Sequence, residues 1–321
     1  MNKKILVAGG GGFIGGHLVN FYQKKGFKVY SVDLKKKNQW FQINSKVKNI
    51  VADCRDPVVC DKITKKMDYV FNLACDMGGM GFIENNKALC MLSAVININL
   101  LKSSKKNNIK KFFYSSSACV YPSFKQKDYT KPKLKESDAY PADPEDGYGW
   151  EKLFNERMCR HFYEDFGLEV RVARFHNVYG EYGSYVGGRE KAPAALARKF
   201  VEGIYKDEKK IEIWGNGKQI RSFLYIDDCI KAVDMLFKSN FRSPLNIGSD
   251  KHVSINQLVG ILEKITNKKF IRKYDLTKPQ GVMSRSSDNT LIKKVLKWSP
   301  DVKMKDGMKK IFYHIKSEIE K

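Results

Sequence analysis

The stretch ILVAGGGGFIGG at residues 5–16 decides the fold class of this chain of 321 residues. Four apolar residues end in four glycines, and a second, mostly apolar stretch follows at residues 13–19. An apolar run that meets glycines before a further periodic segment predicts a strand, a tight turn and a helix. The spacing Gly9-x-x-Gly12-x-x-Gly15 falls on that turn, which is the context that this glycine fingerprint requires.

The glycine fingerprint indicates a dinucleotide site. Glycines allow the tight turn and the close approach of backbone to a diphosphate, and the helix that follows offers free N–H groups to the phosphates. Asp33 lies eighteen residues after Gly15, at the end of the next predicted strand. A carboxylate there accepts hydrogen bonds from a ribose diol and repels a 2′-phosphate, which favours NAD over NADP. A glycine-rich turn with a helix-capping Asp33 is the structural alternative.

Further strands and helices alternate along the chain. We expect strands at residues 28–32, 49–52, 69–74, 112–114, 169–173 and 245–248, with helices in most of the gaps. This alternation predicts an α/β fold, a Rossmann-type doubly wound parallel sheet with right-handed crossovers. After Arg174 the composition changes, so we expect a smaller interleaved C-terminal substrate domain. The predicted division is 1–176 and 223–250 for NAD, and 177–222 and 251–321 for substrate.

Composition excludes several classes of protein. With 42% hydrophobic and 29% charged residues, the chain can bury a core and intrinsic disorder is excluded. No apolar run is long enough for a membrane helix, and residues 5–8 are too short for a signal peptide. Seven scattered cysteines without a C-x-x-C pair predict reduced thiols rather than a disulfide scaffold or a zinc site. We therefore expect a cytoplasmic protein with no membrane partner and no metal.

The net charge of +24 raises the possibility of nucleic-acid binding. The lysines, however, are spread thinly in pairs along the chain, and no aromatic residues interleave them as a base-stacking platform requires. A lysine-rich solvated surface is the preferred interpretation, so no nucleic-acid partner is expected. Such a surface would also attract a phosphorylated metabolite.

Tyr148-Gly149-Trp150-Glu151-Lys152 contains a Y-x-x-x-K motif. Positions i and i+4 share one face of a helix, so the phenol and the ammonium point the same way. A lysine cation, helped by an oxidised nicotinamide, lowers a tyrosine pKa and lets Tyr148 accept a hydroxyl proton during hydride transfer. A surface Tyr–Lys contact would explain the pair alone. Together with the fingerprint and with Ser117 at a strand end, the motif predicts an oxidoreductase-type site.

With these motifs in place, the chain resembles the extended short-chain dehydrogenase/reductase superfamily over nearly its whole length. Members of that superfamily mostly act on nucleotide sugars, and residues 221–228 are similar to the segment whose arginine meets the substrate diphosphate. Four unusual stretches narrow the resemblance to the GDP-mannose 3,5-epimerase family. They are DMGGMGFI at 76–83, SSACVYP at 116–122, RFHNVYG at 174–180 and GGREKAPAA at 187–195.

The resemblance implies a mechanism in which NAD oxidises sugar C4 while Tyr148, Lys152 and Ser117 handle the hydroxyl. The resulting 4-ketone acidifies C3 and C5, and the family's acid–base pair maps onto Cys119 and Lys191. We expect Cys119 to share a strand face with Ser117, two residues earlier, and to have a near-neutral pKa beside a cation. Lys191 requires a lowered pKa, from burial or from nearby positive charge such as Arg189 and Lys152.

The resemblance also implies binding roles. The expected cofactor residues are Gly9, Gly12, Phe13, Ile14, Gly15, Asp33, Asp53, Leu73, Tyr148 and Lys152, with Asp53 near the adenine. The expected substrate residues are Gly78, Ser117, Cys119, Asn177, Glu190, Lys191, Ala192, Lys199, Gln219, Arg221 and Arg285. His176 is expected to be a packed core histidine. A homodimer through the helices near 84–105 and 148–166 is the expected assembly, and GDP-mannose or a close relative is the expected ligand.

Three alternatives remain open at this point. A sugar-nucleotide 4,6-dehydratase needs acid–base carboxylates next to Ser117, where this chain has Ala118 and Cys119. A C4-epimerase needs only the Ser, Tyr and Lys residues, which would leave Cys119 and Lys191 without a role. An NAD-sensing regulator or an RNA-binding protein on an inactive enzyme fold would not require an intact set of Ser117, Tyr148 and Lys152.

Overall fold

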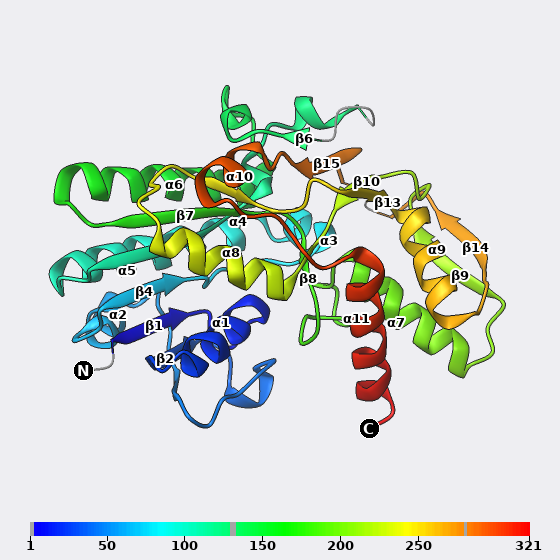
Figure 1. Ribbon diagram of the computed structural model, residues 1–321, viewed down its shortest axis with the longest axis horizontal. Helices are drawn as coiled ribbons and strands as arrows, with labels where there is room; N and C mark the ends of the chain where they lie inside the picture. Colours follow the sequence, from blue (N-terminus) through cyan, green and yellow to red (C-terminus); the bar gives the residue numbers. More distant parts are fainter. Residues whose placement is uncertain (1–2, 129–132, 279–280) are drawn as a thin grey trace.

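A computed structural model describes residues 3–128, 133–278 and 281–321, and its centre is a seven-stranded parallel sheet (Figure 1). The strand order is β3-β2-β1-β4-β5-β7-β12. The bounds are β1 (Lys4–Ala8), β2 (Lys28–Asp33), β3 (Lys48–Val51), β4 (Tyr69–Asn72), β5 (Lys111–Ser117), β7 (Val170–Phe175) and β12 (Leu245–Ile247). Successive strands are added towards one side of the sheet from β1 to β3 and towards the other side from β4 to β12. The sheet is therefore doubly wound, and the predicted fold class is confirmed. In such sheets ligands bind beyond the carboxyl ends of the strands near this change of side.

Helices cover both faces of the sheet, which explains why its strands are almost continuously apolar. Ile5 and Val7 of β1 pack in one core cluster with α1 (Phe13–Lys24) and α8 (Ile226–Lys238). Leu6 and Ala8 pack in another, with α2 (Pro57–Thr64), α5 (Ser93–Lys106) and α6 (Asp146–Phe166). Successive strand residues thus alternate between the two cores, as the two-residue period of a strand dictates.

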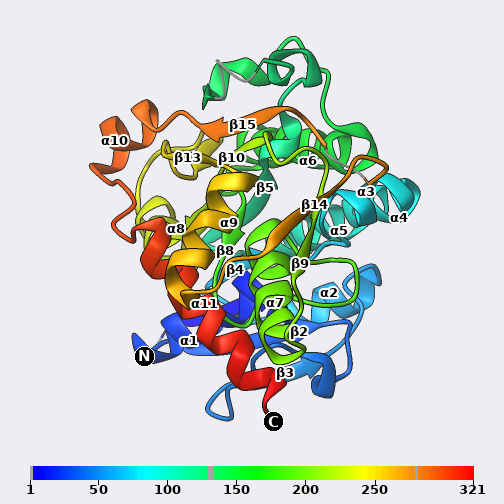
Figure 2. The same ribbon diagram turned by 90° about the vertical axis from the view of Figure 1, so that its right-hand side faces the viewer.

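A second group of elements lies beyond the carboxyl ends of the sheet strands, on the right of Figure 1 and in front in Figure 2. It contains α7 (Ala192–Tyr205), α9 (Ile255–Thr266) and α11 (Met304–Ile319), which pack on one another. The strand pair β9 (Lys210–Trp214) and β14 (Ile271–Asp275) completes it. Pro193 lies in the first turn of α7, where its missing N–H costs nothing. Among the described helices, none has the length and apolar character to cross a bilayer.

Short strands connect the two groups. A four-stranded sheet has the order β13 (His252–Ser254), β10 (Ile220–Ser222), β15 (Ser284–Ser287) and β6 (Lys133–Leu134), and β8 (Val178–Tyr179) pairs with β11 (Leu224–Tyr225). The remaining helices are α3 (Met80–Asn85), α4 (Lys87–Met91), α10 (Thr290–Leu296) and 3-10 turns at Lys37–Gln39, Ala118–Val120, Ser123–Gln126 and Glu136–Ala139.

Buried polar contacts fix α6 against the sheet. Glu156 of α6 receives two hydrogen bonds from Arg174 of β7, at 2.9 and 2.7 Å, and one from Ser116 of β5 at 2.5 Å. Asn155 accepts from Asn97 of α5 at 3.0 Å. These groups are almost inaccessible to water, so a partner lost from this network would leave a buried charge or dipole unpaired. The network therefore holds α6 in one position relative to the end of β5.

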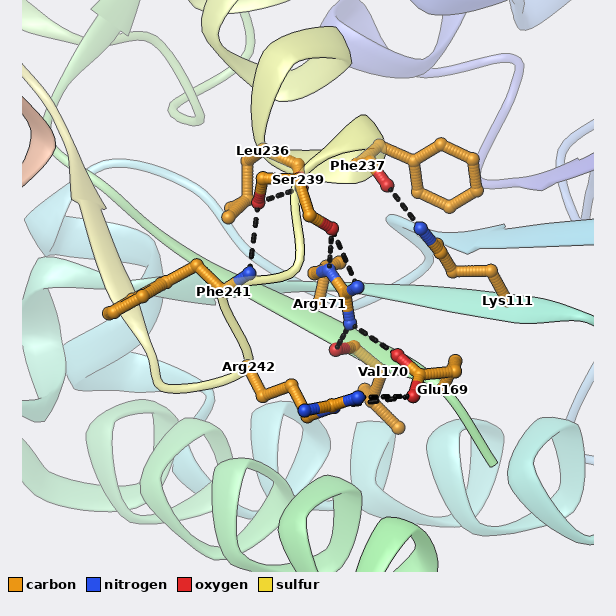
Figure 3. Close-up of polar contacts among 9 residues, drawn as sticks. All are labelled: Lys111, Glu169, Val170, Arg171, Leu236, Phe237, Ser239, Phe241 and Arg242. Atoms are coloured by element: carbon orange, nitrogen blue, oxygen red, sulfur yellow. Dashed lines mark hydrogen bonds and ion pairs between the residues drawn. The ribbon is translucent and has the colours of Figure 1, made fainter. Parts of the chain in front are cut away.

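Arg171 joins the start of β7 to the end of α8 (Figure 3). Its buried guanidinium donates twice to the carbonyl of Ser239, at 2.8 and 2.6 Å, and once to Glu169 at 3.0 Å. Arg242 binds the other oxygen of Glu169 at 2.8 Å. Because the last carbonyls of a helix have no partner within it, these contacts satisfy groups that burial would otherwise leave unpaired.

Candidate active site

The turn after β1 is shaped by glycines that no other residue could replace without displacing backbone. Gly9 has φ +81°, and a Cβ there would lie 2.7 Å from the carbonyl carbon of Leu73. A Cβ on Gly15 would lie 2.0 Å from the carbonyl oxygen of Gly9. α1 begins directly after Gly12, with no side chain capping its first N–H groups. The turn thus leaves a bare helix N-terminus beside the carboxyl end of β1, which fits a dinucleotide diphosphate.

Asp33 ends β2 beside this turn. Its carboxylate accepts hydrogen bonds from the backbone N–H groups of Gly11 and Lys35, both at 3.1 Å. Asp53, in contrast, holds its neighbour Arg55 in a bidentate pair with a shortest contact of 2.7 Å. The hydrogen bond from Arg55 is the main cause that lowers the pKa of Asp53. Asp33 therefore presents its carboxylate beside the glycine turn, whereas the carboxylate of Asp53 is already engaged by a guanidinium.

The Y-x-x-x-K pair lies on the first two turns of α6, facing the end of β5. Tyr148 is 5% and Lys152 1% exposed, so both side chains are buried. The Lys152 ammonium lies 5.4 Å from the centre of the Tyr148 ring and 3.5 Å from a carboxylate oxygen of Glu151. The expectation that both side chains point the same way is confirmed, and a plain surface contact is excluded.

Cys119 is positioned by a 3-10 turn and not, as expected, by the strand that carries Ser117. β5 ends at Ser117, and Cys119 lies in the 3-10 turn that follows, so the alternation of a strand does not relate the two side chains. The expectation of a shared strand face was therefore wrong. Instead, the Ser117 hydroxyl caps the turn and accepts a hydrogen bond from the Cys119 N–H at 3.2 Å. The turn keeps the two side chains in the wall of the same cavity.

That cavity, of about 250 Å³, lies between the sheet and the C-terminal group. Every predicted substrate residue lines it: Gly78, Ser117, Cys119, Asn177, Glu190, Lys191, Ala192, Lys199, Gln219, Arg221 and Arg285, together with Tyr148. It also takes in residues that the sequence did not single out, among them Glu145, Arg198 and Trp214. Within the described parts of the chain, no group of three or more His, Cys, Asp or Glu side chains is placed to hold a metal ion.

With this geometry established, comparison with known proteins defines the family. The sequence profile described as the NAD dependent epimerase/dehydratase family matches residues 5–248. The chain belongs to this family. GDP-mannose 3,5-epimerase of Arabidopsis thaliana is 44% identical to it, over all of this chain and 84% of the relative. GDP-mannose 3,5-epimerase 1 of Oryza sativa subsp. indica is 45% identical, over 99% of this chain and 83% of the relative. The resemblance found in the sequence is thus confirmed.

Solved structures of the family share the whole fold. UDP-glucose 4-epimerase from Thermotoga maritima, with UDP-glucose, superimposes with a TM-score of 0.87 at 25% identity, covering 98% of this chain and 99% of that one. UDP-glucuronic acid 4-epimerase from Bacillus cereus, in complex with UDP-glucuronic acid and NAD, gives 0.80 at 25% identity, with coverage of 98% and 99%. The predicted cofactor, NAD, is that of the family, and the glycine turn fits it.

In this member of the epimerase/dehydratase family, the pKa values of the titratable groups in the cavity are shifted from their ordinary values in water. Burial, followed by the charge of Glu145, raises the pKa of Cys119 to about 11, although Arg285 opposes this. The expectation of a near-neutral thiol was therefore wrong for the structure without ligands. The pKa of Lys191 is lowered, chiefly by burial and then by Arg285, rather than by Arg189 and Lys152. Lys191 also occupies the N-cap position of α7, and a helix N-terminus disfavours a cation.

Burial also governs the Tyr148 hydroxyl. Loss of water raises its pKa well above the ordinary value, the charges of Cys75 and Cys119 add to this, and a hydrogen bond with Ser117 opposes it. For Lys152, burial works to lower the pKa, but attraction to Cys75 and Glu151 outweighs it and the pKa is raised. Lys152 therefore keeps its positive charge behind the tyrosine.

Several predicted binding residues hold protein partners in the structure. Lys199 pairs with Glu212 at 2.9 Å, Asn177 donates to the carbonyl of Ser222 at 3.2 Å, and Arg221 donates to the carbonyl of Val282 at 2.5 Å. Gln219 donates to the carbonyl of Trp214 at 3.3 Å. His176 is fully buried against Asn246, and burial lowers its pKa to about 3, so it is the packed histidine that the sequence predicted.

The glycine pair 78–79 brings Lys191 into the cavity. The Gly79 N–H donates to the carbonyl of Arg189 at 3.1 Å, and a Cβ on Gly79 would lie 2.7 Å from the carbonyl of Glu190. A Cβ on Gly78 would instead lie 2.7 Å from the Cβ of Phe82. These glycines therefore permit residues 78–79 to pack closely on residues 189–190 and on Phe82. A close approach of a sugar is a separate role that they could also serve.

Asp33 carries a prediction about cofactor choice. We expect Asp33→Asn to weaken NAD binding about tenfold and to reduce the preference for NAD over NADP, because a charge-assisted hydrogen bond is lost. Calorimetric titration with both dinucleotides measures the effect. Asp68→Asn is the matched control, since Asp68 pairs with Lys110 beside the opposite end of the sheet. Unchanged affinities in Asp33→Asn would contradict the assignment.

Proposed function

We propose that this chain inverts C3 and C5 of GDP-mannose, or of a closely related nucleotide sugar, through a transient 4-ketone. Its relatives at 44–45% identity carry the name GDP-mannose 3,5-epimerase. The observation that carries the proposal is that one cavity holds Cys119 and Lys191 together with Ser117 and Tyr148. A thiol and an amine beside an oxidation site are what two proton inversions next to a ketone require.

The proposed cofactor site comprises Gly9, Gly12, Phe13, Ile14, Gly15, Asp33, Asp53, Leu73, Tyr148 and Lys152. NAD held by these residues would supply a reversible hydride acceptor for sugar C4. Tyr148 accepts the proton of the C4 hydroxyl, and Ser117 hydrogen-bonds the same oxygen. Because burial raises the Tyr148 pKa, ionisation of the phenol requires the positive charges of Lys152 and of an oxidised nicotinamide. The wall around Tyr148 excludes water, which strengthens these interactions.

Cys119 and Lys191 then act on the carbons next to the ketone. The C–H bond breaks, its proton passes to the base, and the electron pair moves into the enolate of the ketone. A proton from the other group then reaches the same carbon on its opposite face, which inverts the centre. One group cannot serve both faces, so an acid and a base on separate segments of chain are needed. The 3-10 turn and the start of α7 supply them.

We further propose that the two parts of the chain divide the work. The part at 1–176 and 223–250 holds the cofactor and contributes Ser117, Cys119 and Tyr148. The part at 177–222 and 251–321 holds the nucleotide sugar through Lys199, Gln219, Arg221 and Arg285. Arginine suits a diphosphate because its planar fork donates two parallel hydrogen bonds.

Incubation with GDP-mannose and NAD in deuterated water tests the proposal. Deuterium is expected at C3 and C5, because both carbons take their new protons from a thiol and an amine whose own protons exchange with the solvent between turnovers. A C4-epimerase returns the hydride internally and leaves both carbons unlabelled, and a 4,6-dehydratase releases water and lowers the product mass. UDP-glucose serves as the parallel substrate, since 4-epimerases of this fold bind it. Absence of label at both carbons of GDP-mannose would overturn the proposed chemistry.

We also propose a homodimer, through α4, α5 and α6. These helices contact one another, and together with Leu92 between α4 and α5 they expose large apolar side chains: Met91, Leu92, Val95, Trp150 and Phe154 are all 38% or more accessible. Burial of such side chains against a second copy of the chain would remove apolar surface from water. Sedimentation equilibrium is expected to give twice the chain mass, and a monomer at micromolar concentration would contradict the assembly.

A further inference from the structure

Glu151 is a buried carboxylate of α6 to which the proposed mechanism gives no role. It directly precedes Lys152, and both side chains are only 1% exposed. One of its oxygens, Oε2, has no hydrogen-bond partner among the described residues and lies 3.5 Å from the Lys152 ammonium. A charge buried in this way is costly unless it is paired, so the charged forms of Glu151 and Lys152 depend on each other.

A chain of buried hydrogen bonds ends on the other oxygen of Glu151. It begins at the backbone N–H of Ala74, which donates to the Asn72 amide oxygen at 3.2 Å. The Asn72 amide nitrogen donates to Asn97 at 2.9 Å, and Asn97 donates to Asn155 at 3.0 Å. Asn155 then donates to Glu151 Oε1 at 2.6 Å. All three asparagines are buried, so the chain is shielded from water along its length.

The direction of this chain requires an acceptor at its far end. A backbone N–H can only donate, so Asn72 presents its oxygen to Ala74 and its nitrogen to the next amide, and each later amide keeps this orientation. Hydrogen bonds aligned in one direction polarise one another, and an ionised carboxylate accepts more strongly than a neutral group. The Tyr114 hydroxyl donates to the same Oε1 at 3.1 Å. The arrangement therefore suits an ionised Glu151, since a proton on Oε2 would face an ammonium.

Lys152 needs such a partner because burial opposes its charge. The centres of the Tyr114 and Tyr148 rings lie 5.0 and 5.4 Å from its ammonium, and aromatic faces attract a cation. Burial acts to lower the pKa of Lys152, but Cys75 and Glu151 outweigh it and the pKa is raised. Burial also raises the pKa of the Cys75 thiol, so at neutral pH it is Glu151 that supplies the negative charge.

Other titratable groups surround this part of α6. They come from the loop after β4, from α4, from β5, from the turn after β5 and from α6 itself: Cys75, Cys90, Tyr114, Cys119 and Cys159. Burial is the main cause that raises the pKa of each of them, so they are neutral at neutral pH. Lys191, at the start of α7, acts on Cys75 and Cys119. Two further carboxylates of this region are each paired with an arginine: Glu145 with Arg285, and Glu156 with Arg174.

We propose that Glu151 is a positioning residue for hydride transfer: held ionised by the asparagine chain, it keeps the buried Lys152 an ammonium behind Tyr148. This inference rests on the proposed roles of Tyr148 and Lys152. Burial is the main cause of the raised pKa of Tyr148, and the charge of Glu151 contributes to it. Glu151 therefore sets the pH range in which Tyr148 can serve as a base while Lys152 is charged.

The Tyr148 and Lys152 pKa values depend on Glu151 in the same direction. A negative charge stabilises the protonated form of each neighbour, so its removal lowers the pKa of the phenol and of the ammonium together. Hydride transfer slows at low pH when Tyr148 holds its proton, and at high pH when Lys152 has lost its charge. Removal of the Glu151 charge should therefore move both limbs of the pH profile to lower pH. The two groups titrate as a coupled pair, so each limb reports the pair.

The first measurement needs no sugar. The lysine Cε carbons of NAD-loaded enzyme are isotope-labelled, the Lys152 resonance is assigned by its loss in Lys152→Met, and its chemical shift is followed by NMR as the pH is raised. In Glu151→Gln the titration midpoint is expected to fall by about one unit or more, the usual effect of a nearby charge. Glutamine keeps the size of the side chain and removes the charge. An unchanged midpoint in Glu151→Gln would overturn the inference.

Two further variants separate Glu151 from other causes. Cys75→Ala tests the thiol as a rival counter-ion and is expected to keep the wild-type midpoint. Glu164→Gln removes a carboxylate of the same helix, which is 39% exposed and pairs with Arg160, and is also expected to keep it. A fall in Cys75→Ala without one in Glu151→Gln would assign the role to the thiol. An equal fall in Glu164→Gln would reduce the effect to overall charge, and either result would overturn the inference.

The pH dependence of unfolding keeps the inference testable if Glu151→Gln is fragile. In the wild type the pKa of Lys152 is raised, so the contribution of the pair is present below the unfolded pKa and is lost only as pH rises through the folded value. In Glu151→Gln folding favours the neutral amine, so the unfolded chain binds more protons. The stability of Glu151→Gln relative to the wild type is therefore expected to rise as pH increases above neutrality. A deficit that is equal at every pH would indicate a structural defect alone and would contradict the electrostatic role.

Nicotinamide reduction links the inference to turnover. With GDP-mannose in single-turnover absorbance measurements, both limbs of the pH profile of Glu151→Gln are expected to lie at lower pH than in the wild type. Limbs that stay in place while the Lys152 midpoint falls would overturn the claim that Glu151 acts on hydride transfer. A shifted midpoint in a protein whose wild type reduces no nicotinamide with GDP-mannose would refute the proposed function and leave the pairing of Glu151 with Lys152 standing, so the two failures are distinguishable.

Discussion

Cys119→Ala is expected to lower deuterium incorporation at C3 and C5 by about 10²–10⁴-fold, the usual contribution of a positioned acid or base. Cys119 and Lys191 line the proposed reaction site on separate segments of chain, and removal of the thiol leaves one face of each carbon without its acid–base group. The loss measured by NMR of the isolated sugar nucleotide should be equal at both carbons if one thiol serves both centres.

The same variant should retain the oxidation half of the reaction. Tyr148, Lys152 and Ser117 are unaltered, so a small absorbance of reduced nicotinamide should appear when GDP-mannose is added. NAD affinity should equal that of the wild type. Cys60→Ala is the matched control, since Cys60 is a fully buried thiol of α2 outside the cavity. Exchange at the wild-type rate in Cys119→Ala would show that the thiol has no part in proton transfer.

Tyr148→Phe is expected to abolish both halves of the reaction, with a loss of about 10²–10⁴-fold in nicotinamide reduction and in deuterium exchange. Without the phenol no base accepts the C4 hydroxyl proton, so no ketone forms, and C3 and C5 keep the low acidity of an ordinary sugar. The contrast with Cys119→Ala is the informative result, because that variant loses exchange alone. Stopped-flow absorbance and NMR on the same samples measure the two signals.

The substitution should leave the fold intact. Phenylalanine fills the same space on α6, and loss of one hydrogen bond costs about 1 kcal/mol of unfolding free energy. Tyr163→Phe, on the same helix, is the control, because that ring packs against Arg242 away from the cavity. If Tyr148→Phe still exchanged deuterium at C5, ketone formation would not be required and the mechanism would be wrong.

The strands of the main sheet could be predicted because their hydropathy pattern depends only on residues that are close together in the chain. Residues 28–32 and 245–248 differ by one residue each from β2 and β12. The predicted strand at 112–114, by contrast, is too short, because β5 continues through three serines to Ser117. Hydropathy alone does not identify polar residues as part of a buried strand. They are tolerated there because Glu156 of α6 accepts the Ser116 hydroxyl, a contact forty residues away in the chain.

The small sheets could not be predicted in the same way. β15 has the sequence SRSS and is wholly buried, and β6 and β8 have two residues each. Strands this short carry no period, and their partners are distant in sequence. Their existence depends on the packing of the C-terminal group against the main sheet.

For the site, the glycine turn and the predicted residues that line the cavity could be singled out from the sequence, because they lie in local motifs. The glycine spacing needs only the close approach of a turn, and Tyr148 and Lys152 share a face through the pitch of one helix. What the sequence by itself determined was therefore the fold class, the dinucleotide turn and the list of reactive groups. All of these follow from short-range geometry along the chain.

Only the tertiary structure decided the electrostatic state of those groups. Glu145 and Arg285 are separated by 140 residues, and Arg285 and Cys119 by 166, yet they form one buried contact. Ionisation depends on lost water and on the charges within a few ångströms, and neither can be read from neighbours in the chain. The fold thus places Cys119 where burial and the charge of Glu145 raise the thiol pKa, although an arginine lies beside it.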